Sequence, residues 1–139
     1  MRVVFIDGMG GGLMAQVISQ TAGRLPDDVE LIGLGTNALA TAAMLKAGLK
    51  RGATGENAVC VTAQTADVIV GPIGIVLPNS MLGEITPQMA AAVAQSRARK
   101  LLLPVNQNHF EIIGMDNKPM SQLVKEAADK IAEICGSRV

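Results

Sequence analysis

The chain has 139 residues, the usual size of one domain, and its twelve basic and twelve acidic side chains give a formal net charge of zero. Hydrophobic residues make up 49% of it, but aromatic residues only 1%, with neither Trp nor Tyr. Balanced charge and scarce aromatic rings disfavour nucleic-acid binding, which relies on basic faces and base stacking. An aliphatic chain of this size instead suits buried parallel strands covered by helices.

No apolar run approaches the roughly 20 residues of a membrane span, and no signal peptide precedes the first apolar run. Cys60 and Cys135 lie far apart and outside any C-x-x-C pair, which predicts reduced thiols rather than a redox or metal centre. We therefore expect a cytoplasmic protein that contacts neither membrane nor nucleic acid and holds no metal ion.

The first predicted element is a strand at Val3–Ile6, a short apolar run suited to burial on both faces. Glycines then interrupt the run, and from Leu13 a helical pattern continues to about Gly23. Strand, glycine loop and helix in this order open a βαβ unit. Such a loop lets a ligand approach the backbone, and the helix N-terminus offers N–H groups to an anion. The loop glycines are Gly8, Gly10, Gly11 and Gly12.

The glycine spacing resembles a dinucleotide-binding fingerprint in two registers. One is Gly-x-Gly-x-x-Leu starting at Gly8, and the other is Gly-x-Gly-x-x-Ala starting at Gly10. Asp7 precedes the loop, where its charge would oppose a pyrophosphate unless a cation or a base lay between them. Two interpretations stay open: the loop contacts a ligand, or its glycines only provide a tight turn beneath a packed helix.

A second strand is predicted at Val29–Leu34, and a helix follows from about Ala38 to Ala47. Enzymes that select NAD usually place an acid at the end of this strand to hold the ribose, but Gly-Thr-Asn stands there. Thr36 and Asn37 could bind a phosphate or a hydroxyl of a ligand, or simply cap the helix. The predicted buried stripe of the helix is Leu39, Ala43, Met44 and Ala47.

The segment Lys50–Asn57 contains two cations, two glycines, a carboxylate and an amide, and is predicted to be a loop. Its donors could close over an anionic ligand, or it could be a solvated surface loop. Ala58–Thr62 is predicted to be a short strand, with a helical turn as the alternative. Asp67–Gly71 is the stronger strand, because four residues between the two cannot form a parallel crossover.

The segment Gly71–Pro87 is long, with three prolines and three glycines, which is typical of a functional loop. It is also unusually apolar, so it should line a pocket, cover another subunit, or both. We therefore expect a homo-oligomer with Ile73–Ile85 at the interface. Thr86 and Pro87 then begin a helix as N-cap and first helical residue.

The last predicted elements are a central strand at Lys100–Val105, an edge strand at His109–Met115 that folds back antiparallel, and a helix at Met120–Cys135. We expect His109 at the exposed start of its strand, without a catalytic role. Ser121 is the expected cap of the helix and Gly136 its stop.

Alternating strands and helices predict an α/β protein: one Rossmann-like domain over residues 1–139, a three-layer sandwich with a mostly parallel sheet and an antiparallel edge strand. Ligands bind such sheets beyond the carboxyl ends of the strands. The predicted ligand-binding residues gather at these ends and in the two unusual loops. They are Gly8, Gly10, Gly11, Gly12, Thr36, Asn37, Thr54, Gly55, Asn57, Gly71, Pro72, Asn79, Ser80 and Asn106.

Several motifs together resemble a bacterial family of small proteins that is a domain of unknown function, frequent in anaerobes. They span nearly the whole chain: Asp7–Gly12 (DGMGGG), Gly35–Thr41, Met44–Gly48, Gly52–Ala58 (GATGENA), Gly71–Ile75 and Pro78–Pro87 (PNSMLGEITP). The resemblance implies a bacterial cytoplasmic protein and supplies no activity, cofactor or catalytic residue.

Three functions remain open. The first is a binding protein for a nucleotide or a phosphorylated small metabolite, which the glycine loop favours. The second is an enzyme that uses Asp7, Glu56 or Glu84 as acid, base or Mg²⁺ ligand. The third is a partner-binding subunit whose loops form an assembly interface.

Overall fold

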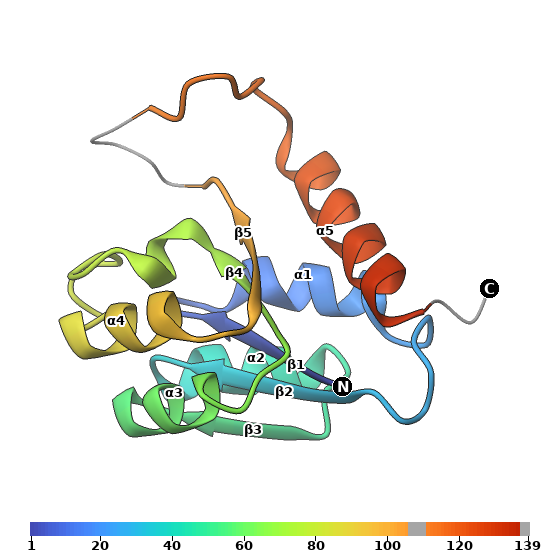
Figure 1. The fold of residues 1–139 in the computed structure, drawn as a ribbon, viewed down its shortest axis with the longest axis horizontal. Coiled ribbons are helices and arrows are strands. Elements are labelled where there is room, and N and C mark those ends of the chain that lie inside the picture. The colour runs from blue at the N-terminus through green and yellow to red at the C-terminus, as the bar shows by residue number, and fades with distance from the viewer. Residues whose placement is uncertain (106–110, 137–139) are drawn as a thin grey trace.

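The computed structural model describes residues 1–105 and 111–136 (Figure 1). Its centre is a five-stranded parallel sheet with the strand order β3-β2-β1-β4-β5. The chain runs outward from β1 to one edge and then returns to β4, so the switch in strand order lies between β1 and β4. The strands are β1 (Arg2–Asp7), β2 (Glu30–Gly35), β3 (Arg51–Thr54), β4 (Val68–Pro72) and β5 (Arg99–Leu103).

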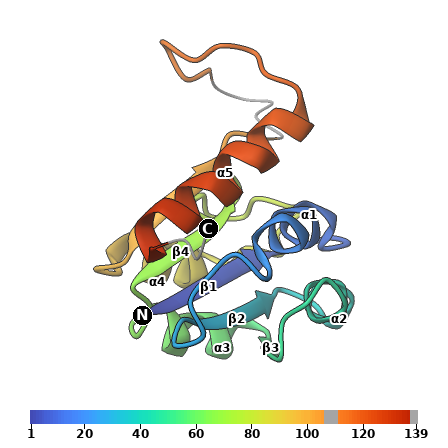
Figure 2. The ribbon, with the colours of Figure 1, turned by 90° about the vertical axis from the view of Figure 1, so that its right-hand side faces the viewer.

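Helices cover both faces of the sheet, which confirms the expected α/β sandwich. Successive residues of β1 point to opposite faces: Val3 and Phe5 pack into the core beneath α1 and α5, whereas Val4 and Ile6 pack beneath α3 and α4. In Figures 1 and 2, α5 lies alongside α1. The helices are α1 (Gly12–Thr21), α2 (Ala38–Lys46), α3 (Glu56–Ala63), α4 (Pro87–Gln95) and α5 (Met120–Cys135), with a 3-10 turn at Ile73–Val76.

Among the residues that the structure describes, the predicted antiparallel edge strand is not seen, and β5 is an edge strand rather than a central one. Residues 111–119 form no strand and extend away from the sheet in both views (Figures 1 and 2). Within this stretch the chain turns, and Met115 N–H donates to Ile112 O at 3.4 Å. Asn106 and His109 lie outside the described residues.

The predicted loop at Lys50–Asn57 and the predicted strand at Ala58–Thr62 are both wrong, whereas the helical alternative for Ala58–Thr62 is correct. Residues 51–54 form β3, an exposed edge strand that pairs with β2. Gly55, with φ of +102°, then turns the chain into α3. Within α3, Val59 and Ala63 are buried four residues apart, so packing against α4 overrides the strand preference of the β-branched residues.

The other helices follow the sequence more closely. Asn37 caps α2 by accepting a hydrogen bond from Ala40 N–H at 2.8 Å, and Thr86 and Pro87 begin α4 as predicted. The buried face of α2 is different, because Leu39 is 68% exposed while Ala40, Thr41 and Met44 face the core. Helix α5 has its predicted bounds and ends at Gly136, but Pro119 rather than Ser121 is its N-cap residue.

The apolar loop after β4 folds mainly onto its own sheet. Ile75 and Ile85 are completely or almost completely buried in the core beneath α3 and α4, and Val76 and Met81 pack against that core. Leu82 alone among the loop's large apolar side chains is strongly exposed, at 93%. The loop therefore buries part of its apolar surface without a second subunit and leaves Leu82 exposed, and the interface expected at Ile73–Ile85 stays a prediction.

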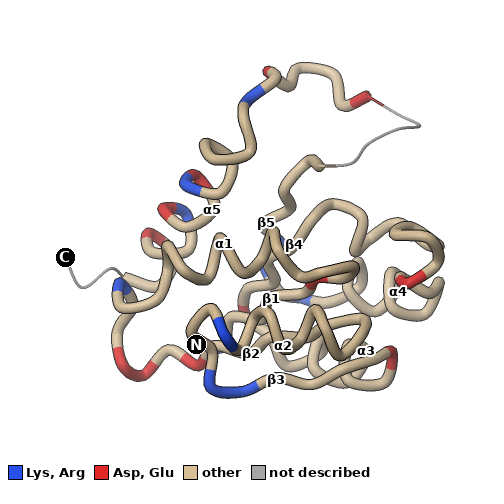
Figure 3. Tube along the Cα trace, turned by 180° about the vertical axis from the view of Figure 1, so that it is seen from behind, with Lys and Arg blue, Asp and Glu red and all other residues tan. Residues whose placement is uncertain are grey.

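Charges of both signs are interspersed along α5 (Figure 3), where Lys125 pairs with Asp129 at 2.6 Å and Lys130 with Glu133 at 3.3 Å. Cys60 and Cys135 are free thiols and partly buried. Among the helices described, none combines the length and apolar character that crossing a membrane requires.

Candidate functional site

The glycine loop is anchored by the carboxylate of Asp7, which is only 5% exposed at the end of β1. Its Oδ1 accepts from Gly8 N–H at 2.8 Å and its Oδ2 from Met14 N–H at 2.9 Å. Burial raises the pKa of Asp7, and the nearby charge of Glu84 raises it further, while the two backbone donors oppose the shift. Since Gly11, the N-cap of α1, has no side chain, Asp7 takes over the capping role.

The loop glycines divide into two pairs. A Cβ at Gly8 would lie 2.7 Å from Met81 Sδ and from Thr36 Oγ1, and a Cβ at Gly11 would lie 2.7 Å from the carbonyl oxygen of Ala40. At Gly10 and Gly12 an added Cβ would meet no atom within 4 Å. The first pair is therefore required by packing within the protein, whereas the second leaves the backbone open to an approaching molecule.

A cavity of about 170 Å³ lies above this loop, at the switch between β1 and β4. Pro72 closes it from the end of β4, and Met81 and Val105 contribute apolar walls. Within the described part of the chain, the N–H groups of Gly12 and Leu13 donate to no protein acceptor, because the first N–H groups of a helix have no carbonyl one turn before them. The remaining wall consists of loop residues 7–11.

Next to the cavity, Glu84 lies over the ends of β1 and β2. Its Oε1 accepts from Met9 N–H and from Asn37 Nδ2, both at 2.9 Å, and also from the Thr36 hydroxyl. These bonds, with that of Thr36 the strongest cause, lower the pKa of Glu84. No acidic residue stands in the sequence at the end of β2, but Glu84, 48 residues beyond Thr36, places a carboxylate there.

The three candidate catalytic carboxylates do not share one cleft. Asp7 and Glu84 lie near each other, but Glu56, on α3, accepts a hydrogen bond from Thr86 instead. In the described residues, no group of three His, Cys, Asp or Glu side chains is placed to hold a metal ion. Of the three candidates, the structure therefore brings Asp7 and Glu84 together but not Glu56.

The other predicted ligand-binding residues mostly have structural roles. Thr54 is hydrogen-bonded to the Thr41 hydroxyl at 2.7 Å, and Gly55 N–H donates to Gly35 O at 2.9 Å. Asn57 is exposed on α3. A Cβ at Gly71 would lie 2.6 Å from Ile6 O, so this glycine permits close packing.

Asn79 and Ser80 organise the loop after β4. Asn79 has φ of +65° and its N–H donates to Ile85 O at 2.7 Å, while the Ser80 hydroxyl donates to Gly74 O at 2.5 Å. Neither residue lines the cavity above the glycine loop.

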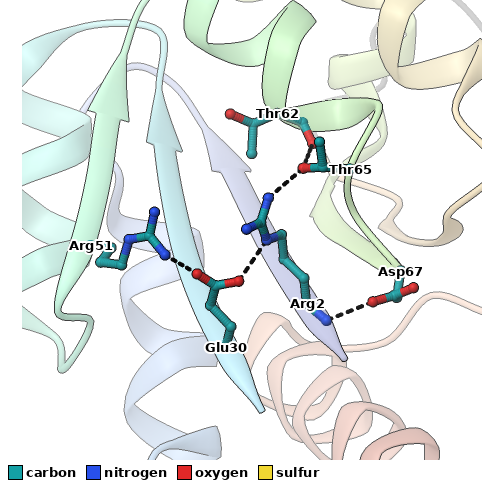
Figure 4. Close-up of polar contacts among 6 residues, drawn as sticks. All are labelled: Arg2, Glu30, Arg51, Thr62, Thr65 and Asp67. Atoms are coloured by element: carbon teal, nitrogen blue, oxygen red, sulfur yellow. Dashed lines mark hydrogen bonds and ion pairs between the residues drawn. The ribbon is translucent and has the colours of Figure 1, made fainter. Parts of the chain in front are cut away.

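A larger cavity, of about 360 Å³, lies at the amino ends of β2 and β3, between residues 22–31 and 48–51. Two of the charged side chains that line it, Glu30 and Arg51, are paired with each other (Figure 4): Arg51 binds one oxygen of Glu30, and Arg2 Nε donates to the other, Oε1, at 2.6 Å. Arg2 also donates to Thr65 Oγ1 at 2.6 Å, and its backbone N–H to Asp67 at 2.7 Å. This network joins the amino ends of the strands and makes that cavity the weaker candidate.

A family model matches residues 2–136, nearly the whole chain, and is described as a domain of unknown function, DUF3842. The chain belongs to the DUF3842 family. No curated protein and no solved structure matches it. The function of this DUF3842 domain therefore has to be argued from its own site.

Sequence reasoning did not identify Met9 and Val105 as parts of the site of this DUF3842 domain, whereas Met81 belongs to the apolar loop that was expected to line a pocket. Met9 is the residue between the first two loop glycines, and its φ of +53° directs its N–H toward Glu84. Met81 and Val105 reach the site from loops whose paths depend on the packing of the whole sheet. A local pattern carries no signal for the position of such residues.

Proposed function

We propose that this DUF3842 domain binds a nucleotide or a phosphorylated small metabolite at the glycine loop of residues 8–12. The observation that supports the proposal most is the cavity at the β1/β4 switch point, which the two unpartnered N–H groups of Gly12 and Leu13 adjoin. Backbone donors at the start of a helix favour a phosphate, because they combine hydrogen bonds with the positive end of the helix dipole.

The open space at Gly10 and Gly12 agrees with this proposal. A loop that served only as a tight turn would need glycine at the close contacts of Gly8 and Gly11, but not at two positions where a side chain meets nothing. Glycine at those positions allows a ligand to reach the backbone itself. The apolar Met81 and Val105 would face the organic part of the ligand.

Thermal-shift and calorimetric titration with ATP, ADP, NAD⁺, NADP⁺ and glucose 6-phosphate tests the proposal. The Gly10→Val variant should lose binding of any compound found, because its side chain fills the approach space, while its own unfolding temperature changes little. The control is Ala94→Val, on the exposed face of α4, which should bind as the wild type does. Binding that survives in Gly10→Val, or that maps to the cavity beside Arg51, would contradict the proposal.

A further inference from the structure

Three donors meet at one carboxylate oxygen. The Met9 N–H comes from the glycine loop, and the Thr36 hydroxyl and the Asn37 amide come from the turn between β2 and α2. We call these three donors the cradle. Its only occupant among the described residues is Glu84 Oε1. Three donors around one oxygen suit an anion better than a neutral group, and the lowered pKa of Glu84 agrees with this preference.

The segment that delivers Glu84 has a strained backbone. Asn79, Met81 and Leu82 have φ of +65°, +56° and +57°, in the left-handed region that non-glycine residues rarely adopt, and Gly83 follows at +89°. The 93% exposed Leu82 contributes almost no buried apolar contact that would hold the segment down. Strain of this kind persists where other interactions hold it and is concentrated in ligand clamps and switch regions.

The cavity beside the cradle is small for the ligand proposed above. Its volume is about 170 Å³, whereas pockets for small molecules usually measure roughly 300–1,000 Å³. Met81 forms one wall of the cavity, and Glu84, three residues later, covers the cradle. Withdrawal of this one segment would therefore enlarge the cavity and uncover the three donors together.

We propose that the cradle is a phosphate-binding subsite, which Glu84 occupies as an internal plug until a phosphate group of the ligand displaces it. This inference rests on the proposed function and adds a second anion subsite, at the ends of β1 and β2, to the one at the start of α1. Phosphate oxygens would accept the same three hydrogen bonds that Glu84 accepts now. The segment 79–84 would then move outward and relax its backbone.

The test is a titration with inorganic phosphate. Binding is monitored by NMR, through the shift of the backbone amide resonance of Met9. A plug that fills the cradle about nine tenths of the time weakens the apparent affinity about tenfold, so Glu84→Ala should bind phosphate at least about tenfold more tightly than the wild type. Glu84→Gln, which keeps the shape of the side chain, should show a smaller gain. Adding Thr36→Val to Glu84→Ala should abolish the gain, because it removes one donor.

The matched control is Glu111→Ala, which removes an exposed carboxylate from residues 111–119 and changes the net charge equally; its phosphate affinity should equal that of the wild type. The plug proposal would be overturned if both Glu84 variants bound phosphate no more tightly than the wild type. It would also be overturned if Glu111→Ala, or the double variant with Thr36→Val, gained as much phosphate affinity as Glu84→Ala. If the nucleotide panel binds at the glycine loop but removing Glu84 gives no gain, the plug fails and the proposed function stands. If removing Glu84 exposes a phosphate site but no compound of the panel binds, the proposed function fails instead.

Discussion

Replacing Gly11 by alanine should destabilise the protein strongly, although the added group is only one methyl. Gly11 has φ of +73°, and its Cβ would lie 2.7 Å from Ala40 O and 2.8 Å from Ala40 Cα. The left-handed conformation costs a non-glycine residue roughly 1–2 kcal/mol, and overpacking costs about 1–3 kcal/mol. The expected loss in the free energy of unfolding is therefore about 2–5 kcal/mol.

Thermal unfolding followed by circular dichroism measures this loss. At about 2.1 cal/mol/K per residue, the 139 residues have an unfolding entropy of about 0.29 kcal/mol/K, so Tm should fall by roughly 7–17 °C. The control is Gly10→Ala, whose Cβ meets no atom within 4 Å and which should change the free energy of unfolding by less than about 0.5 kcal/mol. Equal losses in the two variants, or no loss at Gly11, would refute the packing of the loop against α2.

Three further predictions concern other parts of the molecule. Thr86→Ala should lower the free energy of unfolding, measured by chemical denaturation, by about 1 kcal/mol, because Thr86 Oγ1 caps α4 by accepting from Met89 N–H at 3.2 Å. A variant as stable as the wild type would show that this cap does not stabilise the protein. The pKa of Glu84 lies below its ordinary 4.5, so its hydrogen bonds stabilise the fold above that pH, and this contribution is lost as the pH falls through the lowered pKa. The stability difference between wild type and Glu84→Gln should therefore shrink on acidification, and a difference that grows would contradict the assignment. Sedimentation velocity at micromolar concentration should show a homo-oligomer, which Leu82→Asp or Ile113→Asp weakens because these side chains are 93% and 91% exposed; a wild-type monomer would reject self-association.

The sequence predicts those elements whose signal is local. The run Val3–Ile6 is buried on both faces of a central strand, so every residue in it is apolar, and the glycines mark its end. Thr86 and Pro87 specify the start of α4 by their own chemistry, and the apolar stripe of α5 specifies its full length. These signals sufficed for the sheet class and for the position of the glycine loop.

The errors occur where tertiary contacts decide. Ala58–Thr62 carries β-branched residues typical of a strand, yet burial of Val59 against α4 makes it part of a helix. Sequence alone also does not show that Ile75 and Ile85 of the loop after β4 enter the core beneath α3 and α4. In the site, Thr36, Asn37 and Glu84 were each named as candidates, but the hydrogen bonds that join them were not predicted, since Glu84 comes from a loop 48 residues beyond Thr36.

The two carboxylates at the glycine loop differ in how readily a ligand could replace them. Asp7 binds N–H groups only one and seven residues away, is 5% exposed and is part of β1, so it can leave Met14 N–H only if the start of α1 is disrupted. Glu84 binds its three donors from a strained loop that lines the cavity through Met81. A ligand of the proposed kind would therefore compete with Glu84 and not with Asp7. Substituting Asp7 should lower stability whether or not ligand is present, whereas substituting Glu84 should raise the affinity for a phosphate.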